Sequence, residues 1–193
     1  MEIILNLITV ICICAASGFR IFVPYLILSI SGKIGILIPP GDSLWIYSDI
    51  ALYIFIILAV LEITGYFTPW IDNMLDLIST PLALISGTVL GLMFLADFSP
   101  ALRAVTAFII GGGAAVNIQF LTVKSRSLSS VFPEGNGNTI VSFTELISSV
   151  LTTVLVIISP PVSFAFLILI VILLFRNIIF RDKKAKTANQ ISY

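Results

Sequence analysis

Residues 161–180 read PVSFAFLILIVILLFRNIIF, a run in which Arg176 is the only charged residue. A helix of about 20 predominantly apolar residues is long enough to cross the hydrocarbon core of a bilayer. The run therefore predicts a transmembrane helix. This one segment already indicates the class of the whole chain.

The composition of the remaining chain agrees with a membrane protein. Of 193 residues, 59% are apolar and only 10% are charged, whereas a soluble domain carries about 25% charged residues. These values exclude a soluble globular enzyme and a disordered chain. Ten basic residues balance ten acidic ones, so no basic surface is available to bind nucleic acid.

Several kinds of chemistry are also excluded. The chain has no histidine, which removes histidine-based acid–base catalysis and histidine metal sites. Cys12 and Cys14 lie two residues apart in an apolar run, where we interpret them as small buried apolar side chains. We therefore expect no enzymatic activity, no cofactor and no metal site.

Six stretches are long and apolar enough to be transmembrane helices. They are residues 3–31, 49–67, 74–96, 100–123, 139–158 and 161–180. The first stretch is long for one straight helix, and Gly18 and Pro24 flank Arg20 within it, which predicts a tilted, kinked or broken helix. We thus expect an all-α polytopic membrane protein with one transmembrane domain, residues 1–180, and a basic cytoplasmic tail, residues 181–193.

The distribution of basic residues predicts the orientation. Lysine and arginine favour cytoplasmic loops, and the densest basic run is RDKKAK at residues 181–186. Lys124 and Arg126 open an expected loop at residues 124–138 on the same side. Six spans then place both termini in the cytoplasm. We expect a multi-pass protein of the cell's inner (plasma) membrane whose partners include membrane lipids, since the tail can contact anionic headgroups.

Small residues occupy corresponding positions in the two halves of the chain. Residues 15–18 read AASG in the first span, and Gly111, Gly112 and Gly113 precede two alanines in the fourth. Consecutive glycines weaken a helix. The pattern predicts a three-plus-three inverted repeat with broken first and fourth helices, and the alternative is close packing between small residues.

Five ionisable residues in or near the spans are the main functional candidates. Arg20 lies inside the first span, Glu62 near the inner end of the second, and Asp72 and Asp76 at the start of the third; Glu145 lies early in the fifth. Because intramembrane charges are costly, they mark functional sites. We predict a polar vestibule on the cytoplasmic side in which Arg20 is the only opposing cation. The alternatives are that the two aspartates cap a helix, that Glu62 and Arg20 form a structural pair, and that Glu145 reaches water.

Further polar and small residues complete the list of candidates. Asn117 and Gln119 follow the glycine run, where they line a path or hydrogen-bond to neighbouring helices. Gly87 and Gly91 form a Gly-x-x-x-Gly pair, which allows close helix approach within the bundle or between protomers. We expect a homo-oligomer, with a dimer favoured. Interfacial aromatic anchors are expected at Trp45, Tyr47, Tyr66 and Trp70.

Two stretches of the sequence together resemble a known family. The first contains Gly18, Arg20, Phe22 and Pro24. The second contains Leu61, Glu62, Pro69, Asp72 and Asp76. These elements are similar to those of the bacterial membrane family catalogued as domain of unknown function 4126. The resemblance implies a small multi-span inner-membrane protein with no established activity, and it groups Arg20, Glu62, Asp72 and Asp76 as one set.

The leading functional hypothesis is a small transporter or channel-like protein. Broken first and fourth helices would line a site where Arg20 binds an anionic group or balances the carboxylates, and where Glu62 with the other carboxylates carries a proton or cation. One alternative is a lipid flippase or scramblase in which Arg20 holds a phosphate headgroup. Another is a non-transporting scaffold in which the carboxylates pair internally.

Overall fold

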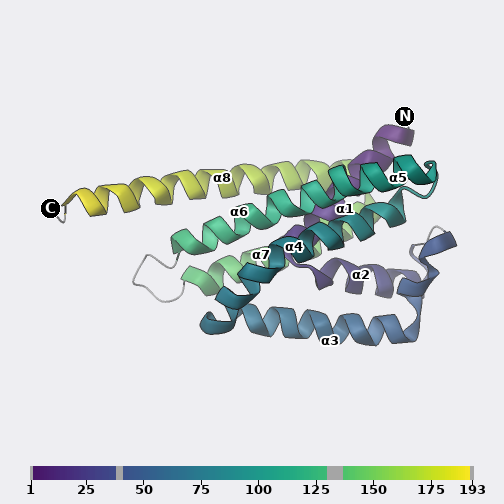
Figure 1. The fold of residues 1–193 in the computed structure, drawn as a ribbon, viewed down its shortest axis with the longest axis horizontal. Helices are drawn as coiled ribbons and strands as arrows, with labels where there is room; N and C mark the ends of the chain where they lie inside the picture. The colour runs from purple at the N-terminus through teal and green to yellow at the C-terminus, as the bar shows by residue number, and fades with distance from the viewer. Residues whose placement is uncertain (1, 38–40, 130–136, 192–193) are drawn as a thin grey trace.

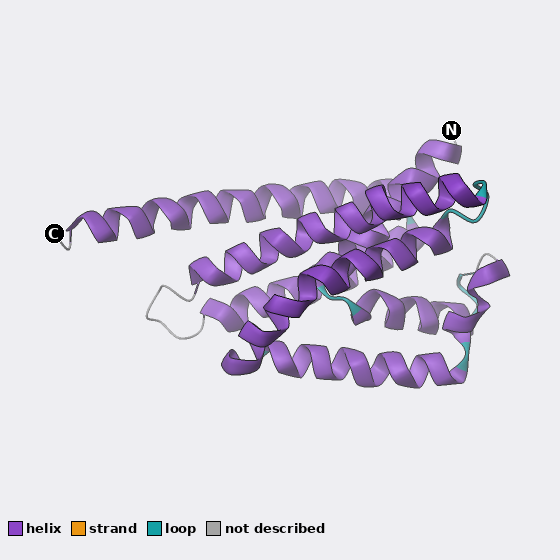
Figure 2. Ribbon diagram, in the orientation of Figure 1, coloured by secondary structure: helices purple, strands orange, loops and turns teal. Residues whose placement is uncertain are grey.

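The computed structural model describes residues 2–37, 41–129 and 137–191, and these residues form helices without any strand (Figures 1 and 2). The elements are α1 (Glu2–Phe19), α2 (Phe22–Lys33), the 3₁₀-helix η1 (Gly41–Tyr47), α3 (Asp49–Tyr66), α4 (Pro69–Phe94), α5 (Pro100–Thr106), the π-helix η2 (Ala107–Gly112), α6 (Gly113–Ser129), α7 (Gly137–Ile158) and α8 (Pro160–Ile191). The all-α prediction is confirmed.

Within the described residues, five helical segments are long and apolar enough to cross a membrane. They are Asp49–Tyr66, Trp70–Phe94, Pro100–Leu128, Thr139–Ile158 and Pro160–Phe180. These segments indicate a multi-pass membrane protein. The expected first span, residues 3–31, is instead divided into two shorter helices, α1 and α2, because the helix stops at Phe19 and restarts at Phe22. The predicted break between Gly18 and Pro24 is therefore present.

The helix α1 runs antiparallel to α7. The Ser149 hydroxyl donates a hydrogen bond to the Ala16 carbonyl at 2.9 Å. Four residues further along the chain, just after the end of α1, the Arg20 guanidinium donates to the carbonyl of Ser142, near the start of α7. The helix α1 therefore begins at the end of the bundle where α7 finishes.

The helix α2 returns toward the same end. Its first residue, Phe22, lies against Glu62 near the end of α3, and its last residue, Lys33, pairs with Asp49 at the start of α3. The two helices thus form a hairpin with Arg20 at its tip, and both open ends of the hairpin lie at one end of the bundle (Figure 1). The start of α1 and the end of α8 consequently lie at opposite ends, which does not reproduce the expected placement of both termini on one side.

Small residues bring α4 into close contact with η2. A Cβ atom added at Gly87 would lie 2.5 Å from the Gly111 carbonyl oxygen, and one added at Gly91 would lie 3.0 Å from Ala107 Cα. The predicted Gly-x-x-x-Gly contact therefore acts inside the bundle, and the expected dimer stays a prediction. Near Gly111 and Gly112 the helix forms a π-helical segment but continues, so the expected break in the fourth span is wrong. The inverted repeat stays a prediction.

The helix α8 lies at the edge of the bundle. Only 17% of its span is buried, compared with 44% for α7, because its sequence is apolar on all sides and suits contact with lipid. The helix continues to Ile191. Residues 181–191 of the expected tail are therefore a helical extension, which projects beyond the other helices in Figure 1.

Candidate functional site

Six charged side chains from four helices and the hairpin tip meet inside one end of the bundle. We call them the charged cluster: Arg20, Glu62, Asp72, Asp76, Arg126 and Glu145. They come from the end of α3, the start of α4, the end of α6, the start of α7 and the α1–α2 break. The structure thus brings together all five ionisable residues predicted from the sequence, and it adds Arg126.

Arg126 holds the centre of the charged cluster. Its Nε and Nη2 atoms donate to the two carboxylate oxygens of Glu145 at 2.9 and 2.7 Å, a bidentate geometry that gives strong, oriented hydrogen bonds. Its Nη1 atom donates to Asp72 at 2.9 Å and to Asp76 at 2.6 Å. One guanidinium therefore joins α4, α6 and α7.

The expectation that Arg20 is the only opposing cation is wrong. The basic-residue pattern predicts a cytoplasmic loop at Arg126, but α6 extends to Ser129 and the Arg126 side chain is 2% exposed. The residues of that expected loop at 130–136 lie outside the described residues. The apolar stretch ends at Val123, and the helix continues because the carboxylates of α4 and α7 compensate the buried charge.

Arg20 lies at the hairpin tip and contacts α7. Its Nη2 atom donates to the Ser142 carbonyl at 2.9 Å and lies 3.3 Å from the Glu145 carboxylate. Its Nε and Nη1 atoms have no hydrogen-bond partner in the described part of the chain. Arg20 is 1% exposed, so its guanidinium lies inside the bundle and does not line an open groove. Glu145, which pairs with both arginines, is also buried rather than directed to water.

Glu62 caps the start of α2. Its two carboxylate oxygens accept hydrogen bonds from the backbone N–H groups of Ile21 at 2.7 Å and Phe22 at 3.0 Å. The first N–H groups of a helix lack partners within that helix and carry partial positive charge. Glu62 therefore stabilises the broken backbone of the hairpin, and no ion pair joins it to Arg20 among the described residues.

Tyr66 lies between the two arginines. The Cζ atoms of Arg20 and Arg126 are 4.0 and 4.1 Å from its ring centroid, which is within the range of a favourable cation–π contact. Tyr66 is 4% exposed, so the expectation that it is an interfacial anchor is wrong. Trp45 and Trp70, two of the other expected anchors, are 48% and 75% exposed.

The charged cluster has more acidic than basic groups. Its four carboxylates face two guanidinium groups, and a charge buried without a counter-charge is costly. If all six groups were ionised, these described side chains would carry two more negative than positive charges. A proton bound to one carboxylate, or a cation nearby, would reduce this imbalance. Asp76 is the most exposed member, at 17%, so it gives the cluster its most direct contact with the surroundings.

The two remaining predicted residues occupy different places. Gln119 is buried and donates to the Ser79 hydroxyl at 2.7 Å, and Ser79 in turn donates to the carbonyl of Asp76. Gln119 thus adjoins the charged cluster. Asn117 is exposed and donates to the Gly113 carbonyl of its own helix, so the structure does not bring Asn117 to the cluster.

A helical pattern in the sequence would have identified Arg126. Gln119, Thr122 and Arg126 are spaced three and four residues apart and share one face of α6; residues at this spacing are neighbours on a helix surface. All three are buried. The same spacing places Ser142, Glu145 and Ser149 on one buried face of α7.

A small cavity reaches the charged cluster from between α3 and α4. Its volume is about 170 Å³, and its lining includes Ile21, Glu62, Tyr66, Ser79 and Leu82. The cavity therefore places open space beside the capped start of α2 and the tyrosine between the arginines.

Comparison with known proteins gives a family but no characterised relative. No curated protein and no solved structure matches the chain. The model of the family described as domain of unknown function 4126 matches residues 7–179. That match covers most of the chain, which therefore belongs to this family.

Proposed function

We propose that this protein is a small membrane transporter or channel-like protein that moves a small solute or ion. The observation that carries the proposal is the charged cluster itself, in which carboxylates outnumber guanidinium groups inside helices of membrane-spanning length. Ionisable residues in such helices are expensive and typically lie on substrate, ion or proton paths. In this proposal a proton or cation balances the excess carboxylate charge.

The hairpin supports a transport role. Transporters commonly bind substrates at interrupted helices, where unpaired backbone groups and helix ends face the site. Here the start of α2 faces Glu62, and Arg20 keeps two donor atoms without protein partners in the described residues. In our proposal these atoms bind an oxygen of the solute or of an accompanying water molecule.

Buried hydroxyl groups beyond the charged cluster provide further support. The Ser29, Ser86 and Thr152 hydroxyls on α2, α4 and α7 are buried, and within the described ranges none has a hydrogen-bond partner. Buried polar groups of this kind usually bind water. We propose that they mark the route between the cluster and the opposite end of the bundle.

We further propose that the end of the bundle with the charged cluster faces the cytoplasm of a cell whose inner membrane contains the protein. The basic run at residues 181–186 follows α8 at this end, in keeping with the excess of lysine and arginine on the cytoplasmic side. Asp76 then faces the cytoplasmic entrance. The proposal gives the protein no catalytic role.

The test measures ion flux in proteoliposomes. A pH-sensitive dye inside the vesicles reports proton flux driven by a potassium–valinomycin potential, and sodium or potassium gradients are tested in parallel. We compare the wild-type protein with Asp76→Asn. The matched control is Asp49→Asn, which removes a carboxylate that is 82% exposed at the other end of the bundle.

We expect flux above that of empty vesicles from the wild type and from Asp49→Asn, and loss of most of it in Asp76→Asn. Equal flux from Asp76→Asn and the wild type would remove the charged cluster from the transport path. A folded wild-type protein without flux of any of these ions would overturn the ion-coupled proposal.

That last result would favour a second candidate, a non-transporting scaffold. It is supported by the extent of internal pairing, since Arg126 alone links three helices through four hydrogen bonds. In a scaffold the charged cluster holds the helices in register and carries nothing.

A further inference from the structure

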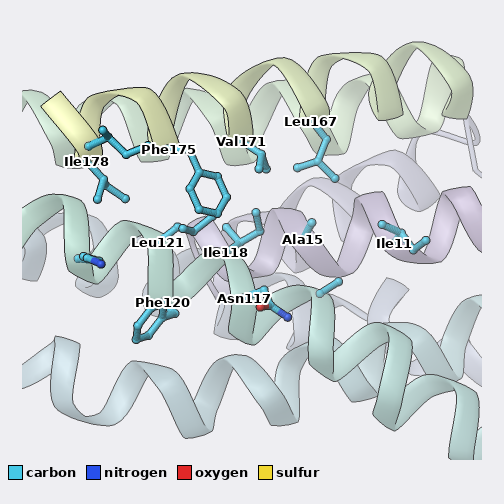
Figure 3. A pocket seen from close by; sticks show the side chains of 13 residues that line it. Ile11, Ala15, Asn117, Ile118, Phe120, Leu121, Leu167, Val171, Phe175 and Ile178 are labelled. Atoms are coloured by element: carbon cyan, nitrogen blue, oxygen red, sulfur yellow. The ribbon is translucent and has the colours of Figure 1, made fainter.

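A second, larger cavity lies between α1, α6 and α8, away from the charged cluster (Figure 3). Its volume is about 650 Å³, within the range typical of ligand pockets. The lining is predominantly apolar and includes Ile11, Ile118, Leu121, Leu167, Val171 and Phe175. Figure 3 shows the Phe175 ring pointing from α8 toward α6. We call this cavity the α6–α8 groove.

The α6–α8 groove is elongated along the helices. Its lining follows α8 from Leu167 to Ile179, and twelve steps of α-helix at 1.5 Å each extend about 18 Å. Because these residues belong to the span Pro160–Phe180, the groove lies at the depth of the hydrocarbon core. An extended apolar chain fits this shape better than a compact solute.

One end of the groove is basic. Lys124 lines it on α6, and Ile178 and Ile179 line it near the end of the α8 span. Lys124 is exposed, and no described carboxylate pairs with it. The sequence after Phe180 continues with the basic run at residues 181–186. The groove is therefore apolar along its length and positively charged where the membrane core ends.

We propose that the α6–α8 groove binds one acyl chain of an anionic phospholipid whose phosphate contacts Lys124. The apolar lining matches the acyl chain, and the lysine at the end of the span matches the charge and depth of the headgroup. The proposal concerns residues outside the charged cluster and is independent of the transport proposal.

The test uses the full-length protein reconstituted in nanodiscs with equal amounts of phosphatidylglycerol and phosphatidylcholine. Native mass spectrometry measures how much of each lipid stays bound. Lys124→Gln removes the headgroup contact, and Ala114→Phe fills the groove from α6, where Ala114 is part of the lining. The control is Lys33→Gln, which removes one positive charge at the opposite end of the bundle.

We expect the wild type and Lys33→Gln to retain phosphatidylglycerol in preference to phosphatidylcholine. Lys124→Gln should reduce this preference about fivefold, the effect of one basic residue near an anionic surface. Ala114→Phe should reduce retention of both lipids. The proposal is overturned if Lys124→Gln has the same preference as Lys33→Gln, or if a folded Ala114→Phe protein retains as much lipid as the wild type.

A second measurement does not depend on filling the groove. Phe175→Trp places an indole in the groove, and lipids brominated on the acyl chain quench indole fluorescence on contact. We expect brominated phosphatidylglycerol to quench the added fluorescence more strongly than brominated phosphatidylcholine, with Trp45 and Trp70 measured in the wild type as background. Equal quenching by the two lipids would show ordinary bilayer contact and would overturn the proposal.

Discussion

Replacement of Arg126 by methionine tests whether the charged cluster holds the bundle together. Arg126→Met keeps a long unbranched side chain but replaces the guanidinium by an apolar end, which removes four hydrogen bonds of 2.6–2.9 Å to three carboxylates. Asp72 and Glu145, which are 3% and 2% exposed, would lose the guanidinium that they contact at 2.9 and 2.7 Å. Removing one partner of a buried ion pair costs about 3–5 kcal/mol, because the remaining charge stays buried without compensation.

The assay is thermal unfolding of the purified protein in a mild detergent, followed by loss of helical circular dichroism. For a chain of this size, 1 kcal/mol lowers Tm by about 2–4 °C, so Arg126→Met should lower Tm by about 6–20 °C. The control is Lys33→Met, which removes a pair with the exposed Asp49 and should cost less than about 1 kcal/mol.

A double variant separates charge from packing. Arg126→Met combined with Glu145→Leu removes both the cation and the carboxylate that it binds at two points. The loss of stability in the double variant should be smaller than the sum of the losses in the two single variants, because neither charge is then left without the other. If Arg126→Met lowers Tm no more than Lys33→Met does, the charged cluster does not stabilise the bundle and our reasoning fails.

Three further substitutions test other contacts. Gly111→Val places a side chain where even an added Cβ atom would lie only 2.6 Å from the Gly87 carbonyl oxygen. This overpacking should cost about 1–3 kcal/mol, and an unchanged Tm would contradict the close contact of η2 with α4. Tyr66→Leu removes the ring between the two guanidinium groups and should cost about 1–4 kcal/mol from two contacts, whereas Tyr66→Phe should retain most of the stability because the ring remains. Glu62→Leu leaves the first N–H groups of α2 without acceptors. The rate of amide hydrogen exchange at Ile21 and Phe22 should then be well above the rate in Glu62→Gln, which keeps one acceptor. Equal exchange rates in the two variants would contradict the capping role.

The all-helical fold class and most of the span positions follow directly from the sequence. The sequence predicts the fifth span at residues 139–158, and the structure has it as Thr139–Ile158. A single apolar segment in lipid can satisfy its own backbone hydrogen bonds only as a helix. The convergence of Arg20, Glu62, Asp72, Asp76 and Glu145 was also predictable. The order of the spans places all five residues at a similar depth in the membrane. A charged side chain at that depth can reach only partners at the same depth.

The hairpin and the role of Arg126 were not predicted, for physical reasons. A mostly apolar stretch of 29 residues, such as residues 3–31, is long enough either to cross the membrane or to turn back within it. Only the contacts with α3 and α7 decide between the two. Arg126 was interpreted by its charge alone, as a marker of the cytoplasmic side. Its burial depends on carboxylates from α4 and α7, which are distant in sequence. The hydropathy of the residues around Arg126 therefore does not predict that its side chain is buried.

The α1–α2 hairpin also has a consequence for how the protein is made. Its tip carries a buried arginine and a stretch of non-helical backbone, which lipid does not solvate. The groups that satisfy this tip are Glu62, 41 residues later, and Ser142, 122 residues later. The hairpin is therefore synthesised before the groups that satisfy its tip, and its final contacts cannot be complete until α7 has been synthesised.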